Sequence, residues 1–137
     1  MRMLTYLVAS ILALSVLGCQ TDEQILRDKS SVVASAAEVK ELLSGNTVTS
    51  LAGDTFYWDS QGWFSGKVSS GSSLKGQWNI TDDGMLCVSN LNGSYSASSC
   101  HKVFFDNSSG QHKVMDLDGN LKYVIINRVA GNPYKFN

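Results

Sequence analysis

SLKGQWNITDDGMLCVSN, residues 73–90, contains the clearest local folding signal of the chain. Apolar and polar side chains alternate over 73–80 and again over 84–90, which is typical of strands with one buried face. Asp82-Asp83-Gly84 separates the two segments. Because an Asp-Gly step between alternating segments favours a tight turn, the stretch predicts an antiparallel β-hairpin.

The period of two continues on both sides of this hairpin, with turn clusters of Gly, Asp, Asn and Ser between the segments. Strict alternation places Phe56 and Trp58 on one face of their strand, and Tyr123, Ile125 and Val129 on one face of the last strand. Eight short strands favour an all-β fold, a meander that closes into a barrel or a tight sandwich, since closure hides the strand edges. Six further strands are predicted, over 46–51, 54–58, 62–68, 99–105, 111–117 and 121–129.

A short helix is predicted immediately before the strands. Ser35 is a suitable N-cap, Glu38 stands three residues later as its capping-box partner, and Gly45 provides a left-handed stop. One apolar stripe on this helix would close an end of the core, and it consists of Val39, Leu42 and Leu43.

The N-terminus has the features of an export signal. Arg2 precedes an apolar run from Leu4 to Leu17, which would form roughly 21 Å of helix and fall short of the ~30 Å hydrocarbon core. We therefore interpret residues 1–18 as a signal peptide. Its end resembles a bacterial lipobox, which implies that Cys19 is lipidated and becomes the first residue after cleavage. An ordinary secretory signal is the alternative.

This resemblance implies a location in the cell envelope, with the membrane reached through the N-terminal lipid. Gln20 follows the cysteine, and it is not the aspartate that retains lipoproteins in the inner membrane of enteric bacteria. We therefore expect the outer membrane, facing the periplasm. The polar residues after the lipid site predict a flexible tether over 19–35, and one β-barrel-like domain is predicted over 36–137.

The remaining cysteines, Cys87 and Cys100, are expected to form a disulfide. An even pair in an oxidising compartment is typical of a structural bond, and closing a loop of this size would stabilise the fold by about 3 kcal/mol. A redox-active pair is the alternative, but such pairs usually have the C-x-x-C spacing, which is not found here.

Several ordered motifs between residues 43 and 136 resemble a family of short exported proteins of alphaproteobacteria and their relatives, catalogued as domain of unknown function 995. The resemblance implies an envelope β-domain with a cysteine pair and no assigned activity, so no functional residues carry over. Gly76-Gln77-Trp78 is also similar to the G-x-W signature of lipocalin-like barrels, where the tryptophan closes one end. The matching motifs are Leu43-Ser44-Gly45-Asn46-Thr47, Asp59-Ser60-Gln61-Gly62, Gly76-Gln77-Trp78, Asp83-Gly84-Met85-Leu86-Cys87 with the later Cys100, and Gly131-Asn132-Pro133.

Composition and residue spacing give little support for a catalytic, metal-binding or nucleic-acid-binding site. Eleven basic and twelve acidic side chains leave a net charge of −1, which argues against nucleic acid as a partner. His101 and His112 are the only histidines, and alternation places His101 on the face opposite its neighbour Cys100. The histidines have no recognised spacing for a metal site. We therefore predict no catalytic residue, no metal, no cofactor and no enzymatic activity.

Aromatic side chains provide the remaining functional signal. We expect Phe56, Trp58 and Trp63 to fill the core, and Tyr57, Phe64 and the loop around Tyr95 to form a partner-binding patch. The leading hypothesis is a non-catalytic envelope lipoprotein that binds an envelope protein, in the manner of an enzyme inhibitor. The alternatives are a lipocalin-like carrier of a small apolar ligand and a passive structural component of the envelope.

Overall fold

The computed structural model describes residues 21–28, 31–94 and 97–137. The predicted signal peptide over 1–18, the predicted lipidation site Cys19 and the loop residue Tyr95 therefore lie outside the described residues. No helix within the described ranges combines the length and the apolar composition that crossing a membrane requires.

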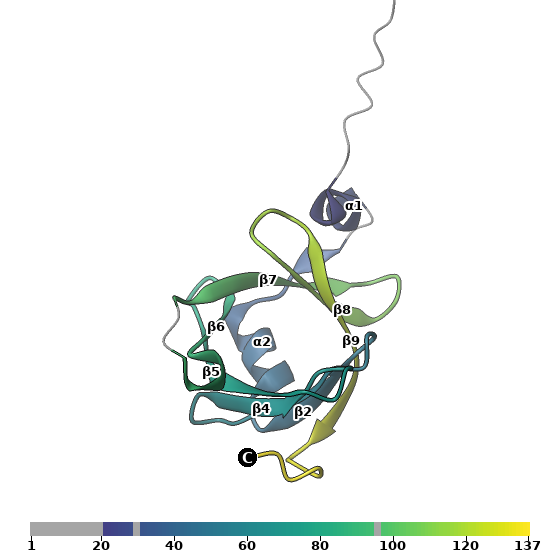
Figure 1. The fold of residues 1–137 in the computed structure, drawn as a ribbon. Helices are drawn as coiled ribbons and strands as arrows, with labels where there is room; N and C mark the ends of the chain where they lie inside the picture. Colours follow the sequence, from purple (N-terminus) through teal and green to yellow (C-terminus); the bar gives the residue numbers. More distant parts are fainter. Residues whose placement is uncertain (1–20, 29–30, 95–96) are drawn as a thin grey trace, which may run out of the picture.

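The described residues form a closed, up-and-down β-barrel of eight strands, in which each strand pairs antiparallel with the next and the last pairs with the first (Figure 1). This confirms the all-β prediction, and the closure makes the fold a barrel rather than a sandwich. All eight predicted strands are present, with ends that differ by at most a few residues. They are β2 (Asn46–Ser50), β3 (Thr55–Trp58), β4 (Trp63–Lys67), β5 (Ser73–Ile80), β6 (Leu86–Ser89), β7 (Ser99–Asp106), β8 (Gln111–Met115) and β9 (Leu121–Ala130).

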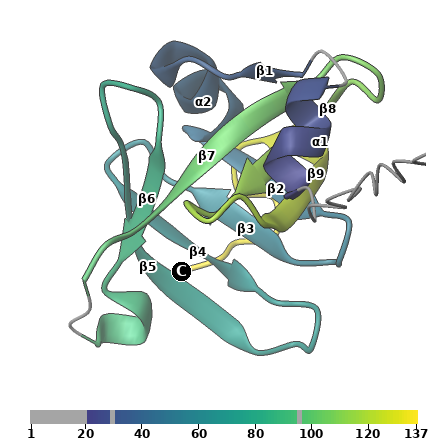
Figure 2. The ribbon, with the colours of Figure 1, turned by 90° about the horizontal axis from the view of Figure 1, so that it is seen from above.

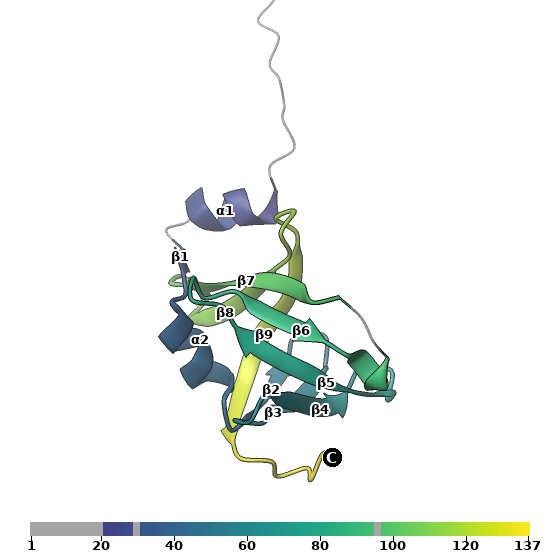
Figure 3. The same ribbon diagram turned by 90° about the vertical axis from the view of Figure 1, so that its left-hand side faces the viewer.

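Helix α2 (Ala36–Leu43) lies across one end of the barrel, which we call the helix end (Figures 1 and 3). The capping box between Ser35 and Glu38 is present, and Gly45 has a φ of 74°, as predicted. The predicted apolar stripe of the helix is buried in the barrel core. Local sequence therefore determines both ends of this helix, and its apolar face determines where it packs.

The up-and-down order places the turns alternately at the helix end and at the opposite end, which we call the open end. In Figure 2, α2 lies on one side of the barrel, whereas the β4–β5 turn and the short green coil η1 (Leu91–Gly93) lie on the other. The turns at the helix end are 59–62, 81–85 and 107–110. The connections at the open end are 51–54, 68–72, 116–120 and, between β6 and β7, the described residues 90–94 and 97–98.

Aromatic residues fill the half of the barrel next to α2. The rings of Trp58 and Phe64 stack with centroids 4.9 Å apart, and Trp78 meets Trp58 edge-on at 5.7 Å. The Trp78 indole Nε1 donates hydrogen bonds of 3.0 Å to the carbonyl oxygens of Asp59 and Trp63. Because Asp59 belongs to a turn of the helix end, Trp78 helps to close that end of the barrel.

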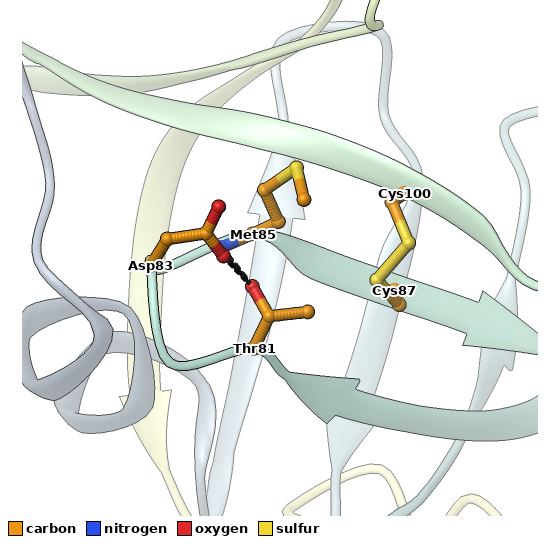
Figure 4. Close-up of a disulfide and its surroundings, with 5 residues drawn as sticks. All are labelled: Thr81, Asp83, Met85, Cys87 and Cys100. Atoms are coloured by element: carbon orange, nitrogen blue, oxygen red, sulfur yellow. Dashed lines mark hydrogen bonds between the residues drawn. A yellow bond between two sulfur atoms is a disulfide. The ribbon is translucent and has the colours of Figure 1, made fainter.

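Cys87 and Cys100 form the predicted disulfide, with a sulfur–sulfur distance of 2.03 Å (Figure 4). The two residues are direct cross-strand partners on β6 and β7. The nearby β5–β6 turn is held by side chains, since Thr81 Oγ1 donates to Asp83 and accepts a 3.0 Å hydrogen bond from the Met85 backbone N–H. The Asp-Gly signal therefore does form a hairpin turn, and the disulfide joins the second strand of this hairpin, β6, to β7.

The prediction of a flexible tether over 19–35 is wrong for the described part of that range. Residues Asp22–Asp28 form helix α1, and Val32–Val33 form strand β1, which pairs with β7. Figure 3 shows α1 lying across the outside of β7 and β8. Phe104 and Met115, whose neighbours Val103 and Val114 are part of the interior core, are completely buried on this outer side. The barrel wall is thus apolar on both faces there, which favours covering it.

Candidate functional site

The barrel encloses a cavity of about 160 Å³. Leu43 of α2, which is buried, lies at its inner end, whereas the partly exposed side chains of Leu91 and Tyr123 belong to its rim. The cavity therefore opens away from α2, at the open end of the barrel. Most of its wall is apolar, with contributions that include Val48, Phe56, Trp58, Leu74 and Val88.

A small number of polar side chains reach the same cavity. Ser50 and Asp54 lie beside each other, because the Asp54 backbone N–H donates a 3.2 Å hydrogen bond to Ser50 Oγ. The Asp54 carboxylate also accepts a 2.8 Å hydrogen bond from the backbone N–H of Ser69. Asp54 is therefore used in part to hold two turns of the open end together, and it gives the rim a negative charge.

His101 contributes an imidazole to the cavity wall. Burial lowers the pKa of His101 below its ordinary value of 6.5, although hydrogen bonds with the backbone of Leu86 and Ser99 oppose the shift. Burial also lowers the pKa of His112, which faces the interior nearer to α2 and contacts the ring of Phe105 at 5.1 Å. The lowered pKa values therefore favour the neutral form of both imidazoles at pH 7.

We expect these two histidines to make the fold less stable in mild acid. A histidine in the unfolded chain binds a proton near pH 6.5, whereas the folded state resists protonation, so the free energy of unfolding falls as the pH drops from 7 towards 5. Urea unfolding at several pH values measures this slope. His101→Gln should remove part of the fall, and the double variant with His112→Gln most of it; an unchanged slope in the double variant would contradict the assignment.

The structure does not bring the histidines into a catalytic or metal-binding group. His101 is at the cavity and His112 is at the helix end, and Cys100 is bonded to Cys87. Within residues 21–28, 31–94 and 97–137, no three side chains of His, Cys, Asp or Glu come together in a way that could hold a metal ion. The site is therefore described by its shape and its apolar wall.

The predicted partner-binding patch does not assemble as expected. Phe64 is buried, with 3% of its surface exposed, because it is the cross-strand partner of Trp58 and shares the interior face with it. Trp63 consequently points outward, where its ring lies 5.6 Å from that of Tyr57. The prediction was thus wrong both for Phe64 as a surface residue and for Trp63 as a core residue. Tyr57 faces outward as expected, and the Tyr95 loop position is not described.

Comparison of the chain with protein-family models, with curated proteins and with solved structures gave no significant match. The resemblance to the exported family of unknown function therefore stays a prediction.

Proposed function

We propose that this protein is a non-catalytic binding protein of the bacterial cell envelope, which holds a small apolar molecule or the end of an apolar chain inside its barrel. The observation that supports this proposal is the cavity of about 160 Å³, open at one end and lined mainly by apolar side chains. Binding sites for small ligands are typically concave and apolar, with a few polar groups that orient the ligand.

The volume limits the size of the ligand. An engineered protein cavity of about 150 Å³ with an apolar lining stays dry and binds benzene. A cavity of this size therefore holds a ring of that kind or the last few carbons of a longer chain, with the remainder outside the rim. Water gains little along the apolar part of the wall, because it needs two to four polar partners.

The ligand proposal can be tested by native mass spectrometry of the protein purified from its own host envelope. We expect an additional mass that is released on unfolding. Val88→Phe, which directs a larger side chain into the cavity, should abolish or strongly reduce this mass. Val129→Phe is the matched control, because Val129 is exposed on the barrel wall and does not line the cavity.

Two results would contradict the proposal. One is a wild-type protein without any retained mass, even after gentle purification. The other is a retained mass that persists in Val88→Phe while the variant remains folded by circular dichroism. The envelope location rests on the predicted signal peptide and Cys19, and labelling of the wild-type protein but not of Cys19→Ser with a radioactive fatty acid would test it separately.

The hypothesis of a protein-binding or inhibitor-like module has less support from the geometry. Of its three predicted contact residues, Tyr57 faces outward and Phe64 is buried in the core. The cavity, by contrast, uses residues from most strands of the barrel. We therefore favour ligand binding, which was the alternative in the sequence analysis.

A further inference from the structure

The rim of the open end carries exposed leucines. Leu51 in the β2–β3 turn is 68% exposed, Leu117 in the β8–β9 turn is 58% exposed, and Leu91 of η1 is 37% exposed. Leu51 lies next to β9, because its backbone N–H donates a 2.8 Å hydrogen bond to the carbonyl oxygen of Val124. Three of the four connections around the cavity mouth therefore present a leucine to the surroundings, although turns usually contain polar residues.

The helix end differs sharply in composition. Its turns over 59–62 and 107–110 consist only of Asp, Asn, Ser, Gln and Gly, and the turn over 81–85 adds Thr81 and the partly buried Met85. Among the turns between strands, the exposed leucines thus lie at the end where the cavity opens, although Tyr134, in the segment that follows β9 at the helix end, is 61% exposed. Exposed apolar patches of this kind mark contacts with a membrane or with another protein.

Of these two partners, a membrane or another protein, the position of the N-terminal residues favours the membrane. Thr21 lies against Gly119 of the β8–β9 turn, and the backbone N–H of Glu23 donates a 3.1 Å hydrogen bond to the Gly119 carbonyl oxygen. Cys19, the predicted lipid attachment site, precedes Thr21 by two residues, a distance that the backbone spans with at most about 7 Å. A lipid on Cys19 would therefore enter the bilayer close to the leucines of the open end.

We propose that the open end of the barrel docks on a lipid bilayer, with Leu51 and Leu117 in the interface, and that the cavity takes up the end of an acyl chain from the membrane. The second part rests on the proposed function. Charges of both signs lie at this end, including the exposed side chains of Asp118 and Lys122. Docking should therefore depend on apolar contact and hardly on anionic lipid or on salt.

The docked orientation can be measured with the lipidated, processed protein in phosphatidylcholine vesicles that contain nitroxide-labelled lipid. A bimane fluorophore is attached to Leu117→Cys at the open end or to Ser109→Cys at the helix end. Position 109 precedes position 117 by eight residues, at the other end of β8. A strand rises about 3.3 Å per residue and is tilted in a barrel, so position 109 should stand roughly 20 Å from the bilayer. We expect quenching at position 117 to be at least about threefold stronger than at position 109, because interfacial side chains enter the bilayer by only ~5–10 Å.

Adding Leu51→Ser to the Leu117→Cys protein should reduce that quenching, whereas the matched change Ile126→Ser should leave it unchanged, because Ile126 is exposed on β9 away from the rim. Equal quenching at 109 and 117, or no effect of Leu51→Ser, would overturn the docking proposal. Neither result affects the mass measurement, which tests cavity binding independently of membranes.

Uptake of an acyl chain can be tested with lipids brominated at the end of the chain, because bromine quenches tryptophan on contact. Trp58 lines the cavity, whereas Trp63 is on the outer wall. We expect brominated vesicles to quench the wild-type protein, Trp58→Phe to lose most of that quenching, and Trp63→Phe to retain it. Quenching that is unchanged in Trp58→Phe, or absent in the wild type, would overturn acyl-chain uptake even if the protein docks.

Discussion

Phe64→Ala is expected to lower the free energy of unfolding by about 3–5 kcal/mol, the usual cost of removing a buried phenylalanine ring. The ring is 3% exposed and is stacked on Trp58, with Phe56 edge-on at 5.8 Å. Its loss would remove one side of the aromatic cluster and leave a space that the rigid strands cannot close. Urea unfolding followed by circular dichroism measures the change.

The neighbouring residue provides a matched control. Trp63→Ala removes a larger side chain from the same strand, but that side chain is 36% exposed and its ring lies 5.6 Å from that of Tyr57 on the outer wall. We expect it to cost clearly less than Phe64→Ala, because it leaves no enclosed space in the core. Equal losses for the two variants, or a larger loss for Trp63→Ala, would contradict the assignment of faces on β4.

Much of the fold could be predicted from the sequence because its signals are local. The strands follow from alternation and from turn residues, and the helix follows from the capping box at Ser35 and Glu38 and from the stop at Gly45. The disulfide between Cys87 and Cys100 could be predicted once the compartment was inferred. None of these features requires knowledge of a distant contact.

The errors arose where register or distant packing decides the outcome. Phe64 and Trp63 are adjacent aromatic residues, and only the pairing of Phe64 with Trp58 shows which one faces inward. On β9, a register shift opposite Thr49 and Ser50 makes Arg128, rather than Val129, the partner of the inward-facing Val48. Strict alternation therefore failed beyond Ile125, because a β-bulge moves the following side chains to the other face.

The candidate site was not predictable for a related reason. Whether an eight-stranded barrel is full or hollow depends on how its interior side chains meet. The aromatic residues gather towards α2, and smaller side chains such as Val48, Val88 and Ser50 also line the wall, which leaves room inside the barrel. One signal for the packing of α1 is present in the sequence: Phe104 and Met115 are apolar residues on the outward face of β7 and β8. Their position indicates that some other segment covers the wall.

Removing the disulfide is expected to cost about 3 kcal/mol in the chain-entropy model for a loop of this size. The bond joins the two strands with the shortest pairing: among the described residues, β6 and β7 share three residue pairs, whereas every other neighbouring pair in the barrel shares four or five. Reduction should therefore weaken this junction more than the rest of the barrel. The double variant Cys87→Ser, Cys100→Ser tests the same effect without a reductant.

The location of the junction connects this stability to the cavity. His101, which lines the cavity, pairs with Leu86 directly beside the bond, and Val88 of the same ladder also reaches the cavity wall. We expect amide hydrogen exchange to accelerate most over 86–89 and 99–101 in the double variant, and any retained ligand to be lost more readily. Dithiothreitol should destabilise the wild type and leave the double variant unaffected. A uniform increase in exchange around the barrel would show that the bond acts only on the unfolded chain, whereas a local increase would mean that the disulfide keeps the wall of the cavity closed.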